Sequence, residues 1–216
     1  MPFTLSPSSL SLVKDCKRCF WLHFNKDIKR PNGIFPSLPS GMDRILKTHF
    51  DAFRDKNELP PELRHLEGYN LFRDVALLET WRNNRKGIRW TDSNENIIRG
   101  AVDNILEKGR KLVVLDYKTR GFPLKDDTHE HYIDQLNIYN LLLQKNGYKT
   151  EKYSYLLFYH PKCVNGDGTV VFNTDLKKIP TSAEKGEEFI KEAIEVLNGE
   201  LPEGNCEFCK WRELKI

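Results

Sequence analysis

The 216-residue sequence has no apolar run long enough to span a membrane, and its longest candidate, residues 153–159, is far too short. Its first residues, Met1 to Ser6, lack the basic and apolar regions of a signal peptide. These absences predict an intracellular, cytoplasmic protein with no membrane partner. In a reducing compartment, the five cysteines are expected to be metal ligands or inert thiols rather than disulfides.

An excess of charge of either sign is also lacking, because 34 basic and 31 acidic residues leave a net charge of +3. This balance permits a nucleic-acid partner at a local basic patch but does not by itself predict one. The sequence shows no internal repeat, low-complexity segment or helicase motif, so a motor would have to come from a partner protein. The length predicts a single domain over residues 1–216.

Helix and turn signals divide the chain into alternating elements. A helix is expected at about 6–25, because Ser6 and Pro7 form a helix start. Further helices are expected at 42–55, 130–146 and 181–198, strands at 96–106, 111–118, 152–160 and 169–172, a loop at 29–41, and a polar tail at 199–216. Residues 71–81 are ambiguous between helix and strand. This mixture predicts an α/β fold with a mixed central sheet and flanking helices.

Two apolar runs close together each end in a carboxylate, Asp103 and Asp116, and the second run continues to Lys118. On a strand Asp116 and Lys118 would share one face, while Tyr117 would point away. A polar turn at 107–111 would set Asp103 opposite Asp116. Like charges in that position destabilise a sheet, whereas a divalent cation between them would make a binding site.

Hydrolysis of a phosphodiester requires a cation that neutralises the phosphate and lowers the pKa of a bound water, and a group that orients the water. Asp103 and Asp116 suit the first task, and Lys118 suits the second. The main-chain carbonyl of Tyr117 could add an oxygen ligand. His49, on the preceding predicted helix, could add an imidazole nitrogen, which favours manganese alongside magnesium. Taken alone, an Asp-x-Lys tripeptide on a strand is usually a solvated face.

This order of residues resembles the PD-(D/E)xK nuclease superfamily, and more narrowly its RecB-like exonuclease branch. In that branch a helical His or Glu, a G-x-x-D strand end and a D/E-x-K strand form the metal centre, and a Q-x-x-x-Y helix follows. Gln135 and Tyr139 match that helix and share one helical face, although they also suit plain surface and core positions. Gly41 lies eight residues before His49 rather than about four, so Asp43 competes as the helical ligand.

The resemblance implies a restriction-endonuclease-like core and a Mg²⁺- or Mn²⁺-dependent nuclease. Lys118, Asp116, Asp103, Gln135 and Tyr139 would be its catalytic residues. The implied substrate is DNA, cut by an exonuclease in DNA repair, recombination or CRISPR spacer acquisition, with helicase or CRISPR-integration proteins as partners. The alternative is a non-cleaving nucleic-acid-binding subunit with the same fold.

Basic residues interleaved with aromatic rings on the first predicted helix favour single-stranded DNA, because charge follows the phosphates and rings stack on bases. The basic residues are Lys14, Lys17, Arg18, Lys26, Lys29 and Arg30, and the rings are Phe20, Trp21, His23 and Phe24. The four-residue spacing of Phe20 and Phe24 favours a helix core for the rings, which leaves the basic residues as a partial phosphate track.

Two C-x-x-C pairs stand at opposite ends of the chain, Cys16 with Cys19 and Cys206 with Cys209. Together they form a complete four-thiolate set, so a shared centre would join the N-terminal helix to the C-terminal tail. The arrangement resembles the iron–sulfur RecB-like nucleases, which implies a [4Fe–4S] cluster, although one N-terminal cysteine commonly joins three C-terminal ones there. Zinc is the main alternative. The fifth cysteine, Cys163, is expected to be inert.

Overall fold

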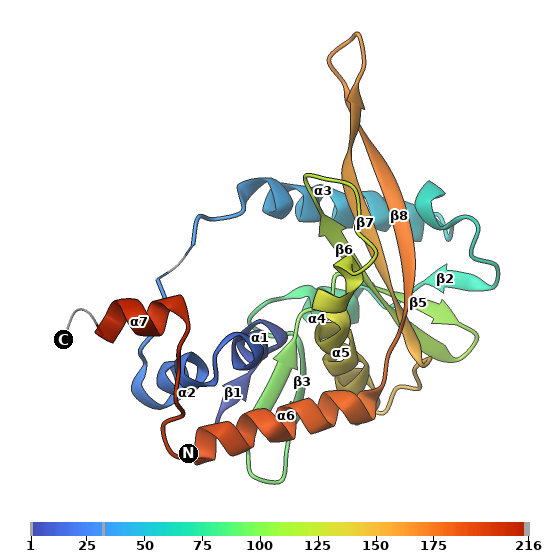
Figure 1. Ribbon diagram of the computed structural model, residues 1–216. Coiled ribbons are helices and arrows are strands. Elements are labelled where there is room, and N and C mark those ends of the chain that lie inside the picture. Colours follow the sequence, from blue (N-terminus) through green and yellow to red (C-terminus); the bar gives the residue numbers. More distant parts are fainter. Residues whose placement is uncertain (1, 32, 214–216) are drawn as a thin grey trace.

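The computed structural model describes residues 2–31 and 33–213 and contains two mixed β-sheets with flanking helices (Figure 1). The larger sheet has the order β2 (Tyr69–Leu71), β5 (Asn104–Lys108), β6 (Lys111–Thr119), β7 (Tyr153–Val164) and β8 (Val170–Pro180). Within it β6 and β7 are parallel and the other neighbours antiparallel. The smaller sheet has the order β1 (Thr4–Leu5), β4 (Ile97–Gly100) and β3 (Ile88–Thr91). The α/β fold with a mixed central sheet is therefore confirmed.

Helices cover both faces of the larger sheet. The helices of the described residues are α1 (Pro7–Asp15), α2 (Lys17–Lys26), α3 (Ser37–Arg54), α4 (Val75–Arg82), α5 (Ile133–Lys145), α6 (Ala183–Asn198) and α7 (Glu207–Glu213), with short 3₁₀ helices η1 (Pro61–Leu63) and η2 (Thr128–Tyr132). Along β6, Val114 joins the core beneath α5, whereas Leu115 and Tyr117 join Phe50 of α3 in a second core. Asp116 and Lys118 follow Val114 in the alternation and therefore face α5.

The hairpin predicted around residues 107–111 is confirmed. Lys108 pairs with Lys111 and Asn104 with Leu115, and Gly109 adopts the positive φ of 58° that this tight turn requires. Continuing that register by one residue sets Asp103 opposite Asp116.

The single strand predicted at 96–106 is wrong, because the chain changes sheets between Gly100 and Asn104. In this link the N–H of Val102 donates to the carbonyl of Trp81 over 3.2 Å, outside either sheet. Each half of the segment has two adjacent apolar residues, Ile97–Ile98 and Ile105–Leu106, so the pattern cannot distinguish one long strand from two strands in different sheets. The link delivers Asp103 to the start of β5.

The single helix predicted at about 6–25 is two helices that meet at Cys16. The Cys16 N–H closes α1 by donating to the Leu12 carbonyl over 2.8 Å, and the Cys16 carbonyl accepts the N–H of Phe20 at 3.1 Å. Cys16 itself has extended backbone angles, φ −170° and ψ 108°. Cys16 therefore caps both helices. Hydrophobic periodicity alone does not reveal this break between α1 and α2.

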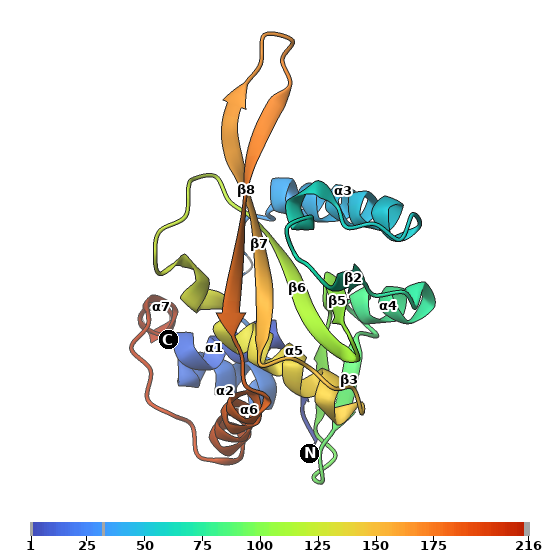
Figure 2. The ribbon, with the colours of Figure 1, turned by 90° about the vertical axis from the view of Figure 1, so that its right-hand side faces the viewer.

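Two further predicted boundaries differ from the structure. Helix α3 begins at Ser37 instead of residue 42 and includes Pro39 in its first turn, where the missing N–H would have no helical partner. Part of the tail predicted at 199–216 forms α7. The hairpin of β7 and β8 is longer than predicted and projects well beyond the other elements (Figures 1 and 2). Among the residues that the structure describes, no helix is both long and apolar enough to cross a bilayer.

Candidate functional site

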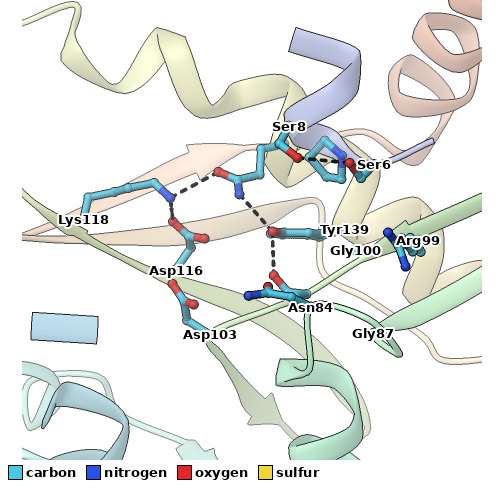
Figure 3. Close-up of a pocket in the computed structure, with 13 residues that line it drawn as sticks. Ser6, Ser8, Asn84, Gly87, Arg99, Gly100, Asp103, Asp116, Lys118 and Tyr139 are labelled. Carbon is cyan, nitrogen blue, oxygen red and sulfur yellow. Dashed lines mark hydrogen bonds and ion pairs between the residues drawn. The ribbon is translucent and has the colours of Figure 1, made fainter. Parts of the chain in front are cut away.

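A cavity of about 480 Å³ is lined by residues of β6, α5, the β4–β5 link and the start of α1 (Figure 3). The structure brings five predicted residues together in its lining, namely Asp103, Asp116, Lys118, Gln135 and Tyr139. They come from three separate segments, and Figure 3 shows Asp116 between Lys118 and Asp103, with Tyr139 beside them. The geometry predicted from strand alternation and helix spacing is thus present in one place.

Lys118 is the central positive charge of the cavity. Its Nζ forms an ion pair with Asp116 and donates a hydrogen bond of 3.2 Å to Oε1 of Gln135. Burial acts to lower the pKa of Lys118, but the charges of Asp116 and Asp103 raise it overall. Lys118 is therefore an ammonium ion at neutral pH, suited to stabilising negative charge and to orienting a water, and unsuited to removing a proton.

Asp103 and Asp116 form a pair of neighbouring carboxylates. Oδ2 of Asp103 accepts the backbone N–H of Tyr117 at 3.1 Å, and Nζ of Lys47 lies 3.4 Å from its Oδ1. Burial, followed by the charge of Asp116, raises the pKa of Asp103 to about 7. The Asp116 side chain is buried, and its Oδ2 is paired with Lys118 without a well-oriented hydrogen bond. This donor set fits a divalent cation, which would relieve the repulsion of the two carboxylates.

Gln135 and Tyr139 connect the cavity to the link between the two sheets. Nε2 of Gln135 donates to the Tyr139 hydroxyl over 2.8 Å, and that hydroxyl donates to the Ala101 carbonyl over 2.6 Å. Burial raises the pKa of Tyr139 well above its usual value, so its O–H remains a donor. A Cβ on Gly100 would lie 2.7 Å from the Tyr139 ring. Tyr139 therefore holds the link in place and needs glycine beside it.

The structure does not bring His49 into this cavity. Its Nε2 lies 3.1 Å from Glu62, and its ring packs against Phe53. Over the described part of the chain, Asp103 and Asp116 do not join any third His, Cys, Asp or Glu in a set of ligand atoms within 4.8 Å of one another. The role of His49 as a metal ligand stays a prediction, as does that of the Tyr117 carbonyl.

Asp43, the competing residue, lies closer to the aspartate pair. Its Oδ2 accepts a hydrogen bond of 2.8 Å from Lys47, the residue that also contacts Asp103. Lys47 and His49 are two residues apart and so point in directions that differ by about 200° around the helix axis. His49 and Lys47 therefore cannot both face Asp103, whereas Asp43 and Lys47 share one helical face.

Sequence reasoning missed the buried arginines that bond to the link between β4 and β5. Nε of Arg82 donates to the Asp103 carbonyl over 2.9 Å, and the buried Arg82 guanidinium pairs with Asp51 of α3. Arg54, also buried, donates to Oδ1 of Asn104 over 2.6 Å. The spacing of Lys47, Asp51 and Arg54 along one helical face was a signal in the sequence, but it does not show which strand that face meets.

Several of the basic and aromatic residues predicted to contact single-stranded DNA are engaged within the protein itself. Lys14, Lys17 and Lys29 form ion pairs with Asp134, Glu192 and Asp27, the first of these with the start of α5. Phe20 is fully buried, and its ring packs at 5.0 Å against that of Phe24. These two rings serve the core beneath α1 and α2.

The two C-x-x-C pairs meet where α1, α2 and α7 come together, as Figure 1 shows for the helices. The four sulfur atoms all lie within 4.8 Å of one another. Burial acts to raise the pKa of Cys206, but the backbone N–H of Cys209 and the neighbouring thiols lower it to about 6. Burial raises the pKa of Cys19 and of Cys209. A set of four cysteines can hold a zinc ion or an iron–sulfur cluster, and a bound metal favours their thiolate forms. Cys163 is exposed and outside the group.

The family model of the PD-(D/E)XK nuclease superfamily matches residues 4–214, nearly the whole chain. A search of curated proteins found no match. The chain therefore belongs to the PD-(D/E)XK nuclease superfamily, whose members use divalent metal ions.

Proposed function

We propose that this member of the superfamily is a Mg²⁺- or Mn²⁺-dependent DNA nuclease that hydrolyses phosphodiester bonds in the cavity between β6 and α5. The observation that carries the proposal is the convergence of Asp103, Asp116 and Lys118 in one cavity, with the lysine paired to one of two mutually repelling carboxylates. A protein that only bound nucleic acid would have no need for a buried ammonium beside such a pair.

Asp103 and Asp116 would hold the cation. When bound, the cation would neutralise the scissile phosphate and lower the pKa of a water ligand. Lys118 would orient that water through its N–H groups and stabilise charge that develops on the phosphate. Gln135 fixes the direction of the ammonium group, and Tyr139 fixes the backbone that carries Asp103, so both act as positioning residues.

The third ligand from α3 would be Asp43 rather than His49. This choice is supported by the bond from Asp43 to Lys47 and by the contact of Lys47 with Asp103. Lys47 would then release both carboxylates when the cation binds, because a divalent ion replaces its single charge. Asp43→Ala should raise the Mn²⁺ concentration needed for half-maximal activity, and His49→Ala should leave it unchanged.

Within the superfamily, we place the chain in the RecB-like branch, with an exonuclease mode and a preference for single-stranded DNA. The hydrogen-bonded Gln135 and Tyr139 support the branch, since the Q-x-x-x-Y motif is its distinguishing helix. Mode and preference are tested directly with labelled linear and circular DNA, each single- and double-stranded. An exonuclease leaves circular substrates intact, and activity on double-stranded DNA equal to that on single strands would contradict the preference.

The decisive experiment compares the wild type with Lys118→Ala and Asp116→Ala on labelled DNA, with Mn²⁺, with Mg²⁺ and with chelator. Both variants should lose at least about 100-fold in rate, because each removes a charge that acts on the transition state. Lys111→Ala is the matched control, since Lys111 is an exposed lysine of the same strand, paired with Glu151.

Cutting that survives chelator, or equal cutting by the variants, would contradict the proposal. Binding of DNA without any cleavage in either metal would favour the alternative, a nucleic-acid-binding subunit with a nuclease fold.

A further inference from the structure

The four cysteine sulfurs lie unusually close together for atoms on three different helix ends. Cys19 Sγ is 3.5 Å from Cys206 Sγ and 3.6 Å from Cys209 Sγ, and Cys16 Sγ is 3.8 Å from Cys209 Sγ. Within the C-terminal pair, Cys206 and Cys209 are 3.6 Å apart. Four of the six sulfur pairs are thus 3.5–3.8 Å apart, and the other two pairs lie within 4.8 Å. This compact set approaches the corners of a tetrahedron.

A separation of 3.5–3.8 Å is close to the edge of a tetrahedron around a single ion. With a zinc–sulfur bond of about 2.3 Å, the tetrahedral edge is about 3.8 Å. In a [4Fe–4S] cluster each thiolate binds a different iron, so the whole cubane lies between the four sulfurs and pushes them much further apart. The observed separations fit the first arrangement and leave no room for the second.

We propose that Cys16, Cys19, Cys206 and Cys209 hold one tetrahedral Zn²⁺ ion instead of the iron–sulfur cluster that the family resemblance implies, and that Arg30 stabilises it. Four thiolates around one Zn²⁺ carry a net charge of −2, which requires compensation in a partly buried place. Nη2 of Arg30 lies 3.6 Å from Cys206 Sγ, so this side chain supplies positive charge at the site.

Two backbone features match this proposal. The N–H of Cys209 donates to the Cys206 sulfur, which orients that sulfur within the C-terminal C-x-x-C before any ion arrives. Gly204 lets the chain wrap closely around the site, since a Cβ there would lie 3.0 Å from Cys209 Sγ and 2.6 Å from the Arg18 side chain. The proposal concerns this centre alone and stands whether or not the cavity cuts DNA.

The test is the metal content of full-length protein made in medium that contains both iron and zinc, and purified without oxygen so that an iron–sulfur cluster would survive. The expected result is one zinc per chain, with no iron, no acid-labile sulfide and no absorbance near about 400 nm. Iron and sulfide in roughly fourfold amounts would overturn the proposal, and so would protein that contains neither zinc nor iron.

A second measurement needs no variant. Co²⁺ added to metal-free protein should give the intense visible bands of tetrahedral cobalt–thiolate coordination, with saturation at one equivalent, and Zn²⁺ should then remove them. Bands of an octahedral ion, or saturation at a different stoichiometry, would contradict a single tetrahedral site.

Variants separate the ligands from the supporting arginine. Cys206→Ser should lose the zinc, while Cys163→Ser, the matched cysteine outside the group, should retain it. Arg30→Gln should retain zinc but lose it to a chelator about 10-fold faster or more, the size expected for a group that supports a ligand. Asp15→Asn removes the other partner of Arg30 and should keep the wild-type rate. Equal rates for Arg30→Gln and the wild type would refute the role of Arg30.

Discussion

Ionised Asp103 sits in the folded protein at an energetic disadvantage that a bound cation would remove. Its burial and the charge of Asp116 oppose ionisation, while Tyr117 and Lys47 keep the carboxylate in place. Sites built for function often carry such strain, and relieving it by mutation then increases stability while activity is lost.

Asp103→Asn should therefore stabilise the metal-free protein by about 1–2 kcal/mol at pH 8, because it removes a buried like-charge repulsion. Folding raises the pKa of Asp103 to about 7, so protonation favours the folded state. The wild type should gain stability as the pH falls from about 7 towards 4, and the advantage of the variant should shrink over the same range.

Urea unfolding in the presence of a chelator at several pH values measures both effects. Asp126→Asn, on an exposed loop, is the control and should change little. A variant that is less stable than the wild type at pH 8 would contradict the repulsion between the two carboxylates.

Tyr139 offers a second test at the level of one atom. Tyr139→Phe keeps the ring against Gly100 but removes the hydrogen bonds to Ala101 and Gln135. Stability should fall by about 1 kcal/mol, and kcat on DNA should fall about 10-fold with little change in KM, because Asp103 loses its fixed position. Tyr148→Phe, outside the cavity, should leave kcat unchanged. A rise in KM alone would instead indicate that Tyr139 contacts the substrate.

At this scale, the sequence predicts what depends on local geometry. The shared direction of Asp116 and Lys118 follows from the two-residue period of a strand, and the pairing of Gln135 with Tyr139 follows from one helical turn. The approach of Lys47 to Asp103 depends on how α3 docks on the sheet, and no residue spacing records that.

Among the elements, the close contact between α5 and α6 depends on a glycine. A Cβ on Gly186 of α6 would lie 2.8 Å from the Asn137 carbonyl of α5. Gly41, within α3, has open space around the same position. The two helical glycines thus differ in packing while sharing the same low helix propensity.

Alanine at these two positions should have opposite effects on unfolding free energy. Gly41→Ala should stabilise the protein by up to about 1 kcal/mol, since alanine loses less backbone entropy on folding. Gly186→Ala should destabilise it by about 1–3 kcal/mol, because α6 must move away from α5. Chemical denaturation measures both, and a stabilising Gly186→Ala would mean that the two helices pack less tightly than the structure describes.

The boundaries of helices and strands were predicted correctly where a local turn residue determines them. They were missed where contacts with distant segments determine them. Gly109 identifies the hairpin of β5 and β6 from the sequence, because its positive φ is a local requirement. The division between β4 and β5 has no such mark, since the Tyr139 hydroxyl and the Trp81 carbonyl that hold the link come from distant segments. The break at Cys16 likewise has no mark in the sequence, because the residues on both sides of it predict one continuous helix.

For the whole molecule, the thiolate centre connects the first helices to the last. Its N-terminal half lies at the end of α1, whose other end, at Ser6 and Ser8, lines the cavity that contains Asp103, Asp116 and Lys118. Trp21 adds a second connection, since its Nε1 donates to the Gly199 carbonyl over 2.9 Å. Loss of the ion should therefore loosen α1 and α2 before it disturbs the larger sheet.

Cys206→Ser should lower the Tm by several degrees and speed tryptic cleavage after Lys17 and Arg18, both on α2, because the ion stabilises only the folded form. Cleavage after Lys111, in the larger sheet, should stay slow. Mass spectrometry of timed digests measures the two sites side by side, with Cys163→Ser as control. Equal acceleration at both sites would mean that the centre supports the entire fold instead of one end of it.

The sequence separation of the two cysteine pairs also has a consequence for biosynthesis. Cys19 and Cys206 are 187 residues apart. At about 5–20 residues per second, a ribosome adds the second pair roughly 10 to 40 s after the first. Throughout that interval the N-terminal thiols are made but have no partners, so a complete four-thiolate site exists only on a chain translated through Cys209. Loading of the proposed ion would thus distinguish chains that extend through Cys209 from shorter translation products, which would leave the ribosome without it.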